Sequence, residues 1–432
     1  MVAESRRVEG SRRSAFALHG LVAASFVSGL GTAMAAVAVP WLVLEETGSA
    51  VATGVVGFAQ LAPYVLLQAT AGPLVDRVGP RRIVLAGTAA AAIAIGAVPV
   101  VIALGQDELS VLAALVAVAG GARGLADAAT APLLPALADA AKAPIERATG
   151  AYAAANRGSL LVGMPLGGVA VALVGAAGVL VVDAIAFFVA ALLVATLVPA
   201  AGVRPSAPIG PLRVRAYAAE LAEGMRFLRT DRLLLGIVTM VAATNLLDEA
   251  LTSVFLPVWA RDSAHSAAAF GLIGGALGLG ALIGVLLGAW LGPRVPRWAT
   301  YAICTVLSGA PPFFALAFSA SVPAVVVVAL ACGALGGALN PIVGAVQFER
   351  IPPPLHARVL GAVKASAWIG IPFGSLAGGA LTSALGLTPA LLVSGAAMLL
   401  TTLAPLLFPA WRGLDRPATA SGGVRQDAPG PA

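Results

Sequence analysis

The sequence predicts an all-α integral membrane protein with twelve transmembrane helices in two pseudo-symmetric six-helix halves. Hydrophobic residues make up 59% of the 432-residue chain and charged residues only 11%, and the apolar residues gather in long stretches. A soluble domain carries about 25% charged residues. The chain therefore holds more apolar surface than a water-soluble fold can bury, and a lipid bilayer is its expected solvent.

Twelve stretches are long enough to cross a hydrocarbon layer about 30 Å thick, which takes roughly 20 apolar residues in a helix. The 50 glycines and 30 prolines do not argue against helices here, because neighbouring helices in a membrane bundle satisfy the backbone groups that such residues free. The predicted spans are residues 16–44, 51–75, 82–104, 109–137, 149–173, 177–199, 234–260, 267–291, 298–319, 322–346, 358–384 and 388–408.

Basic residues gather on one side of these spans. They precede the first span and recur in every second loop and in the C-terminal tail, whereas Arg261 stands in a loop of the opposite side. By the positive-inside rule both termini are cytoplasmic in a bacterial inner membrane. The net charge of +6 thus reflects topology, and we expect no nucleic-acid partner.

A polar segment divides the chain near its middle, and residues 217–229 within it have the pattern of a surface helix. The Pro-, Gly- and Ser-rich tail has the composition of a disordered segment. The expected organisation is a cytoplasmic N-terminal segment 1–15, an N-terminal half 16–199, a cytoplasmic linker 200–233, a C-terminal half 234–410 and a disordered cytoplasmic tail 411–432.

The loop after the second span carries a compact charged motif, Gly72-Pro-Leu74-Val-Asp76-Arg77-Val-Gly79-Pro-Arg81-Arg82. It resembles the loop between the second and third helices of the major facilitator superfamily, which reads Gly-x-Leu-x-Asp-Arg-x-Gly followed by basic residues. The resemblance implies a gate in which Asp76 and Arg77 latch the two halves together on the cytoplasmic side. The alternative is that the basic residues only anchor the topology. The gating-loop residues are Gly72, Asp76, Arg77, Gly79, Arg81 and Arg82.

The halves also resemble each other, as the parallel repeats of this superfamily do. A shift of 211 positions superimposes the fifth span on the eleventh, which predicts a common geometry for the two. The superimposed pairs are Arg147 and Arg358, Gly150 and Gly361, Gly163 and Gly374, Gly167 and Gly378, Gly168 and Gly379, and Gly175 and Gly386.

The fifth span reads Gly163-Met-Pro165-Leu-Gly167-Gly168. This is similar to the Gly-Pro-x-x-Gly-Gly pattern of exporters in the superfamily, with the proline moved by one residue. Small residues let helices approach closely, and proline bends a helix by removing a hydrogen bond. Residues 38–49, 131–135 and 180–187 resemble a bacterial exporter branch that includes macrolide and siderophore efflux proteins.

Charged residues within the spans are candidate functional sites, since each costs about 2.5 to 3.5 kcal/mol at the bilayer centre. On the seventh span, Asn245, Asp248, Glu249 and Thr252 recur at helical spacing and are expected to share one face. Two adjacent acids away from water disfavour double ionisation, so Asp248 or Glu249 is a proton-coupling candidate. The alternative is a purely structural contact with a neighbouring helix.

Other spans carry further polar groups. Arg123, Asp127 and Thr130 fall at i, i+4 and i+7 on the fourth span, and either form a coupling site or a self-neutralised ion pair. Asn156 and Ser159 on the fifth span suggest that this part of the span lines a water-filled cavity. The substrate-cavity candidates are Asn245, Thr252, Asn156, Ser159 and Thr130, and structural roles are expected for Arg157, Asp183 and Lys364.

The resemblance implies a secondary active transporter that exports an amphipathic drug, antibiotic, siderophore or metabolite by proton antiport and alternating access, acting as a monomer. The alternatives are a proton-coupled importer and a non-transporting sensor or scaffold. Lys142 and Lys364 are each followed by Ala, so there is no phosphate-binding loop. His19, His265 and His356 lack metal-ligand spacing. Enzyme activity, a cofactor and a bound metal are therefore not expected.

Overall fold

The computed structural model describes residues 2–105, 108–199, 214–319 and 321–415, which are almost entirely helical. Eleven helical runs in this part of the chain are long and apolar enough to cross a membrane. The longest, Ile145–Leu197, has 53 residues and contains Gly175 with the non-helical angles φ 76° and ψ 163°. Gly175 divides this run into two spans, and the prediction of a twelve-span helical membrane protein is confirmed.

The N-terminal group of helices begins with a single long helix, because α1 runs from Val2 without a break at the expected start of the first span. The second span is shorter than predicted. It ends at Thr70, and a separate short helix covers most of the charged loop, since Pro73 cannot donate the hydrogen bond that would continue the span. The helices are α1 (Val2–Thr47), α2 (Ala50–Thr70), α3 (Gly72–Val78), α4 (Pro80–Ala103), α5 (Leu109–Ala140) and α6 (Ile145–Leu197).

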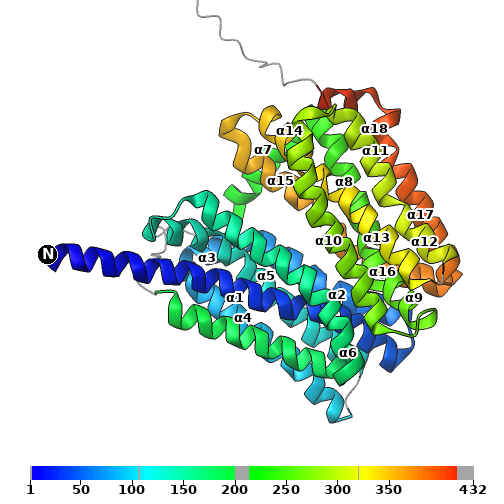
Figure 1. Ribbon diagram of the computed structural model, residues 1–432, viewed down its shortest axis with the longest axis horizontal. Helices are drawn as coiled ribbons and strands as arrows, with labels where there is room; N and C mark the ends of the chain where they lie inside the picture. Colours follow the sequence, from blue (N-terminus) through cyan, green and yellow to red (C-terminus); the bar gives the residue numbers. More distant parts are fainter. Residues whose placement is uncertain (1, 106–107, 200–213, 320, 416–432) are drawn as a thin grey trace, which may run out of the picture.

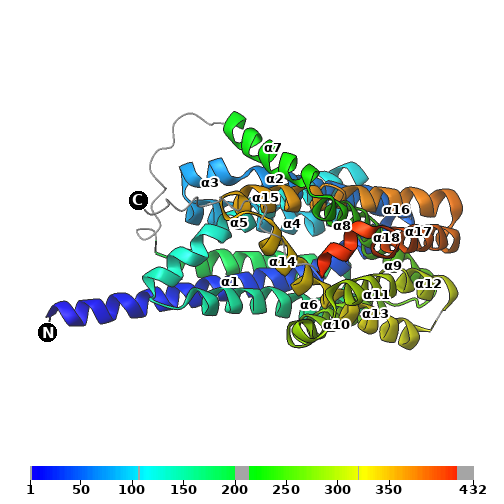
Figure 2. The same cartoon turned by 90° about the horizontal axis from the view of Figure 1, so that it is seen from above.

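The described part of the linker is the helix α7 (Val214–Thr230), close to the expected surface helix; residues 200–213 lie outside the described residues. This helix runs beside α15 (Figure 2). Its Glu223 accepts a 2.7 Å ion-pair hydrogen bond from Arg358. The linker is thereby attached to the C-terminal group of helices.

The C-terminal spans are more broken than those of the N-terminal group. The seventh contains a π-helix, and each later span except the eighth consists of two helices. These are α8 (Arg232–Ala250), a π-helix (Leu251–Phe255), α9 (Leu256–Asp262), α10 (Ala267–Leu291), α11 (Arg297–Gly309), α12 (Pro311–Phe318), α13 (Val322–Gly337), α14 (Leu339–Arg350), α15 (His356–Trp368), α16 (Ile371–Leu385), α17 (Leu387–Thr402) and α18 (Ala404–Leu407).

Order continues beyond the last span, where a 3₁₀-helix covers Pro409–Leu414. Trp411 is 3% exposed and its ring stacks on Tyr301 at a centroid distance of 5.6 Å. The start of the expected disordered tail is therefore corrected for residues 411–415, which the Trp411 ring anchors to the bundle. The remaining tail, 416–432, lies outside the described residues.

The two groups of helices lie at an angle to each other (Figure 1). They meet where α2, α9 and α16 lie and diverge toward α3 on one side and α15 on the other. Large apolar side chains cover the outside of both groups, with exposed fractions of 78% at Leu173 and 74% at Phe318. Such a surface suits contact with lipid rather than water.

The repeat expected from the sequence is observed at one pair of equivalent glycines. Gly386 has φ 85° and ψ 165°, nearly the same angles as its counterpart Gly175. Both glycines stand between two consecutive spans in a backbone conformation that other residues rarely adopt. The fifth and sixth spans therefore turn into each other in the same way as the eleventh and twelfth.

Candidate functional site

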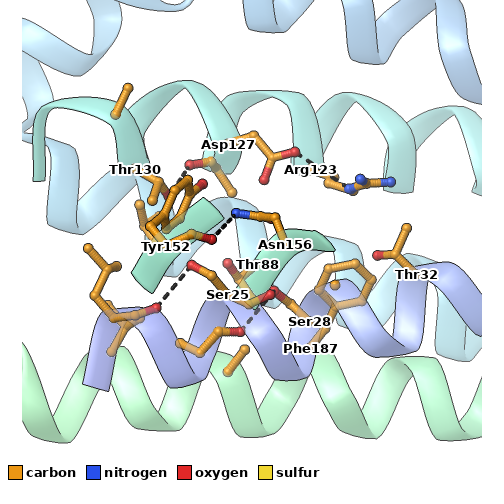
Figure 3. A pocket seen from close by; sticks show the side chains of 18 of the residues that line it. Ser25, Ser28, Thr32, Thr88, Arg123, Asp127, Thr130, Tyr152, Asn156 and Phe187 are labelled. Carbon is orange, nitrogen blue, oxygen red and sulfur yellow. Dashed lines mark hydrogen bonds and ion pairs between the residues drawn. The ribbon is translucent and has the colours of Figure 1, made fainter. Parts of the chain in front are cut away.

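A cavity of about 410 Å³ lies within the N-terminal group of helices, and α1, α2, α4, α5 and α6 all line it. Figure 3 shows its wall, in which hydroxyl and amide side chains of α1 and α6 face charged side chains of α5. We call it the N-terminal cavity. Its polar lining consists of Ser25, Ser28, Thr32, Tyr64, Gln68, Thr88, Arg123, Asp127, Thr130, Tyr152, Asn156 and Lys364.

Arg123 and Asp127 form the ion pair that their spacing suggested. Arg123 Nε lies 3.6 Å from Asp127 Oδ2, which also accepts a 3.0 Å hydrogen bond from the Tyr64 hydroxyl. The Arg123 guanidinium lies over the Tyr64 ring, 5.0 Å from its centroid, and Gln68 Nε2 donates to the Tyr64 hydroxyl at 3.3 Å. The Arg123 and Asp127 side chains remain 35% and 39% exposed, so the pair is accessible to a ligand.

A second cation reaches this cavity from the C-terminal group of helices. Lys364 of α15 lines the N-terminal cavity, with its Nζ 4.7 Å from the centroid of the Trp368 ring. Lys364, Arg123 and Asp127 together give the wall of this cavity one net positive charge. The N-terminal cavity is therefore bounded by both groups of helices, and Lys364 belongs to the site.

A cavity of about 490 Å³ lies in the C-terminal group, lined by α8, α10, α11, α13, α14, α15 and α17. Its polar residues are amides and hydroxyls with one carboxylate, Asp248. We call it the C-terminal cavity. The two cavities thus differ in charge: the N-terminal cavity has one net positive charge, and the C-terminal cavity has one acid.

Asp248 and Glu249 have different surroundings although they are neighbours in sequence. Asp248 is exposed in the C-terminal cavity, and within the described ranges no group forms an ion pair or hydrogen bond with its carboxylate. Glu249 accepts a hydrogen bond from the Ser253 hydroxyl and packs against Gly374 of α16. The expectation of one shared face holds for Asp248 but not for Glu249, which the helix turns toward α16.

The seventh span changes its hydrogen-bond pattern three residues after Asp248. Residues Leu251–Phe255 form a π-helix, which Leu256 closes by donating its backbone N–H to the Leu251 carbonyl. Single π-turns of this kind are frequent at functional sites. The turn separates the part of the span that carries Asp248 from α9, which carries Arg261.

Glycines bring the two groups of helices into contact near the first residues of α2 and α10. A Cβ atom at Gly168 of α6 would lie 2.6 Å from the Ala267 carbonyl oxygen of α10. At the equivalent Gly379 of α16 it would lie 2.7 Å from the Ala50 carbonyl oxygen of α2. Only small residues allow backbones to approach so closely, and the site is closed at this end.

A hydrogen bond between the two groups reinforces the closure. Arg261 Nη1, in the last turn of α9, donates to the Leu44 carbonyl oxygen near the end of α1 at 2.8 Å. This carbonyl also accepts a 3.0 Å hydrogen bond from the Gly48 N–H and lies in the last turn of a helix, where the backbone carries partial negative charge. Arg261, the basic residue that stood apart in the sequence, therefore joins the two groups.

At the opposite end Arg81, the first arginine after Gly79 of the charged loop, binds its own group of helices. Arg81 of α4 donates to the carbonyl oxygens of Val198 and Ala195, at 2.7 and 2.8 Å. Asp76 is exposed, and no ion pair among the described residues joins it to the C-terminal group. Gly79 follows with φ 95°, a backbone conformation that residues with a side chain rarely adopt. Among the described residues, Asp76 thus forms no latch between the two groups in this conformation.

The structure distributes the predicted cavity residues over both walls. Thr130 and Asn156 line the N-terminal cavity, and Asn245 and Thr252 line the C-terminal cavity. Ser159 does neither: it is 1% exposed, and its hydroxyl donates to the Asn156 carbonyl at 2.9 Å. The expectation that Ser159 lines the substrate cavity is corrected, because α1 approaches α6 closely here and the Ser159 side chain packs against Gly29.

Two members of the charged cluster, Tyr64 and Gln68, were missed in the sequence. With Gln60 they recur every fourth residue along the otherwise apolar second span. A polar stripe at this spacing marks one face of a helix. This stripe could have marked the polar face of α2 in the sequence, although it does not name the helix that packs against that face.

The family model of the Major Facilitator Superfamily matches residues 21–247 and 238–431 of the chain. Two curated relatives, each named multidrug efflux pump Tap, are 30% identical to it. The protein of Mycobacterium tuberculosis (strain ATCC 25618 / H37Rv) aligns over 399 residues, which is 91% of this chain and 93% of the relative. The protein of Mycolicibacterium fortuitum aligns over 400 residues, or 91% and 95%.

Solved structures share the fold at much lower identity. The crystal structure of an aspartate-to-alanine mutant of the nucleoside transporter NupG matches with a TM-score of 0.73 and 12% identity, covering 90% of this chain and 99% of that one. The structure of NupG itself matches with a TM-score of 0.67 and 14% identity, covering 90% and 98%. These similarities show the fold alone.

Proposed function

Since the chain belongs to the major facilitator superfamily, and is thus a multi-pass membrane transporter rather than an enzyme, we propose that it exports an amphipathic small molecule by proton antiport. The similarity to multidrug efflux pumps supports the direction of transport. The proposal of proton coupling rests on the Asp248 carboxylate, which faces the C-terminal cavity and has no partner among the described residues.

The transport cycle moves two halves, residues 16–199 and 234–410, against each other by alternating access. The basic loops lie in the cytoplasm with both termini, in a bacterial inner membrane. The end closed by Gly168, Gly379 and Arg261 is then the outer end, and the conformation is inward-open. One monomer contains both cavities and is the expected working unit.

The two cavity walls favour an amphipathic substrate. Asp248 suits a cationic or hydrogen-bonding group, whereas Arg123 and Lys364 suit an acceptor group on the opposite side. Apolar side chains such as Phe187 and Met240 fill the space between the polar groups of the lining. A lipophilic molecule with a few polar groups would match this arrangement.

Coupling requires that the proton and the substrate compete for the Asp248 carboxylate. A proton that reaches Asp248 from outside removes its charge and releases the substrate, and its loss to the cytoplasm resets the carboxylate. A membrane potential of 100 mV supplies about 2.3 kcal/mol per charge, which is roughly a fortyfold gradient. Glu249 and the Arg123–Asp127 pair remain secondary coupling candidates because both already have partners.

The test uses inverted membrane vesicles loaded with a pH-sensitive dye, energised, and exposed to lipophilic cations, macrolides and siderophores. Substrate-evoked proton release is expected in the wild type and absent in Asp248→Asn. The matched control is Asp262→Asn, the same substitution at an exposed acid of the same span. An unchanged accumulation ratio in Asp248→Asn contradicts coupling at this residue, and proton uptake with the substrate indicates an importer.

A further inference from the structure

One buried carboxyl group has no role in this mechanism. Asp183 lies on the second arm of α6, 2% exposed, and its Oδ1 makes no hydrogen bond among the described residues. The oxygen lies against α1, where a Cβ built at Gly31 would stand 2.5 Å from it. A carboxylate buried without partners is strongly disfavoured, whereas a neutral carboxylic acid is tolerated. The neutral acid therefore suits this position better than the carboxylate.

The helices packed against Asp183 supply no counter-charge in contact with it. Gly31 of α1 touches the carboxyl, and Gly96 of α4 packs on the adjacent Ala184. Neither α1 between residues 20 and 44, nor α4 between residues 83 and 103, nor α6 between residues 176 and 197 contains another titratable side chain. The charged group that acts on Asp183 is Arg123 of α5, through space rather than through a bond.

Asp183 lies directly behind the wall of the N-terminal cavity. Phe187, one helical turn further along the same helix, lines that cavity, and so does Thr32, the neighbour of Gly31 on α1 (Figure 3). The contact between Asp183 and Gly31 is therefore flanked on each helix by a residue of the cavity lining. A substrate that displaced Phe187 or Thr32 would open a path for cavity water to the carboxyl.

We propose that Asp183 is a second proton-binding site of the transporter, loaded in this conformation and emptied when a substrate occupies the N-terminal cavity. The O–H bond of the acid breaks, the proton leaves into the cavity water, and the carboxylate that remains is attracted by Arg123. The inference rests on the proposed proton antiport. It adds one proton to the number exchanged for each substrate.

The test counts the protons released when the detergent-solubilised protein, in weakly buffered solution, binds tetraphenylphosphonium. The wild type is expected to release one proton more per bound cation than Asp183→Asn. The matched control is Ser394→Ala, since the Ser394 hydroxyl is also buried and has no hydrogen-bond partner in the described part of the chain, but lies in the C-terminal group. It should release as many protons as the wild type.

An equal proton count in Asp183→Asn and the wild type overturns this inference alone. A wild-type protein that binds the cation and releases no proton overturns the antiport proposal and this inference with it. The two failures are therefore distinguishable in one titration.

A second measurement needs no variant and so does not depend on the folding of Asp183→Asn. Dicyclohexylcarbodiimide reacts with protonated carboxyl groups in apolar surroundings, and mass spectrometry locates the adduct. We expect an adduct on the peptide containing Asp183 that falls several-fold when tetraphenylphosphonium is bound. A protein modified at Asp248 but not at Asp183 contradicts the proposal.

Discussion

Asp248 is left free in its cavity because the polar residues around it are already engaged. The Asn245 amide donates to the Ala367 carbonyl of α15 at 2.9 Å, and Glu249 is held by Ser253. Thr252 Oγ1 donates to the backbone carbonyl of Asp248 rather than to its carboxylate, also at 2.9 Å. The carboxylate is thus available to a proton or to a substrate.

Tyr64 should matter through Asp127 rather than on its own. Tyr64→Phe removes the 3.0 Å hydrogen bond to that carboxylate, and a hydrogen bond to a charged group contributes about 1.5 to 3 kcal/mol. We expect a lower melting temperature of the purified protein and slower transport. The control is a double-mutant cycle with Asp127→Asn. If the two losses simply add, the residues do not act together.

At this scale the sequence predicts contacts within a helix better than contacts between helices. The Arg123–Asp127 pair follows from a spacing of four residues, and it is observed. Tyr64 joins it from α2, and Lys364 enters from the other group of helices. Neither contact has a periodic signal that names its partner, because both depend on how separate helices pack.

Among the helices, α6 and α16 hold each group together and also join the two groups. Adjacent glycines do this: Gly167 packs on Met34 of α1, whereas Gly168 packs on α10. Their counterparts repeat the arrangement, with Gly378 on Ala250 of α8 and Gly379 on α2. Each helix therefore presents one glycine to its own half and the next glycine to the other half.

A methyl group at the outer contact should favour the opposite conformation. Gly168→Ala places a Cβ 2.6 Å from a backbone oxygen, so α6 and α10 must separate. Distances between spin labels on the outer ends of α2 and α16 should lengthen, and transport should fall at least tenfold. The matched control is Gly278→Ala in α10, where nothing lies within 4 Å. Unchanged distances in Gly168→Ala would refute the role of this contact.

The turn between the two arms of α6 should require glycine. Gly175 has φ 76°, and a left-handed conformation costs other residues about 1 to 2 kcal/mol. Gly175→Ala should therefore lower the melting temperature by several degrees. Gly150→Ala in the same helix is the control, because it has open space and helical geometry and should be neutral or stabilising. Equal melting temperatures would argue against strain at Gly175.

Hydropathy places the spans well but not their interruptions. The breaks after Gly309, Gly337 and Trp368 lie inside uniformly apolar stretches. A window average over such a stretch does not change at a break, whereas proline marks each one: Pro311, Pro341 and Pro372 follow within four residues. The repeat at 211 positions predicted a different feature, the common geometry of Gly175 and Gly386, because it compares individual glycines.

Across the whole molecule, closure at one end and separation at the other follow from different kinds of contact. Backbones meet through glycines near the start of α2 and α10, with Arg261 as a polar link. The ion pairs Arg297–Glu349 and Arg350–Asp231, at 2.7 Å each, stay within the C-terminal group. These ion pairs at the open end thus stabilise the C-terminal group itself.

Removal of the Arg261 link should shift the balance of conformations. Arg261→Gln loses a hydrogen bond from a charged donor, worth about 1.5 to 3 kcal/mol, or roughly a tenfold to hundredfold change in the ratio of states. The outward-open fraction, measured by spin-label distances across the outer end, should rise. Arg294→Gln is the control, since Arg294 lies over Trp290 of its own group. An unchanged ratio in Arg261→Gln would contradict the prediction.

Composition and loop charges predict the membrane class and the span number, and the charged loop predicts the family. They do not predict which end is closed. A transporter occupies at least two conformations with one sequence. The position of Asp76 in the latched state therefore stays a prediction, because the present conformation has that end open.

The π-helix between Asp248 and Arg261 contains one residue more in its hydrogen-bonded turn than an α-helix does. Removal of one residue from Leu251–Phe255 would convert this wide turn into a regular α-helical turn. Both kinds of turn complete about one revolution around the helix axis, so Arg261 would still face Leu44. The same deletion within the regular helix α9 would instead turn Arg261 by about 100° and break the link to Leu44. The extra residue of the π-turn therefore makes this one stretch of the span tolerant of a single-codon deletion that the next stretch would not survive.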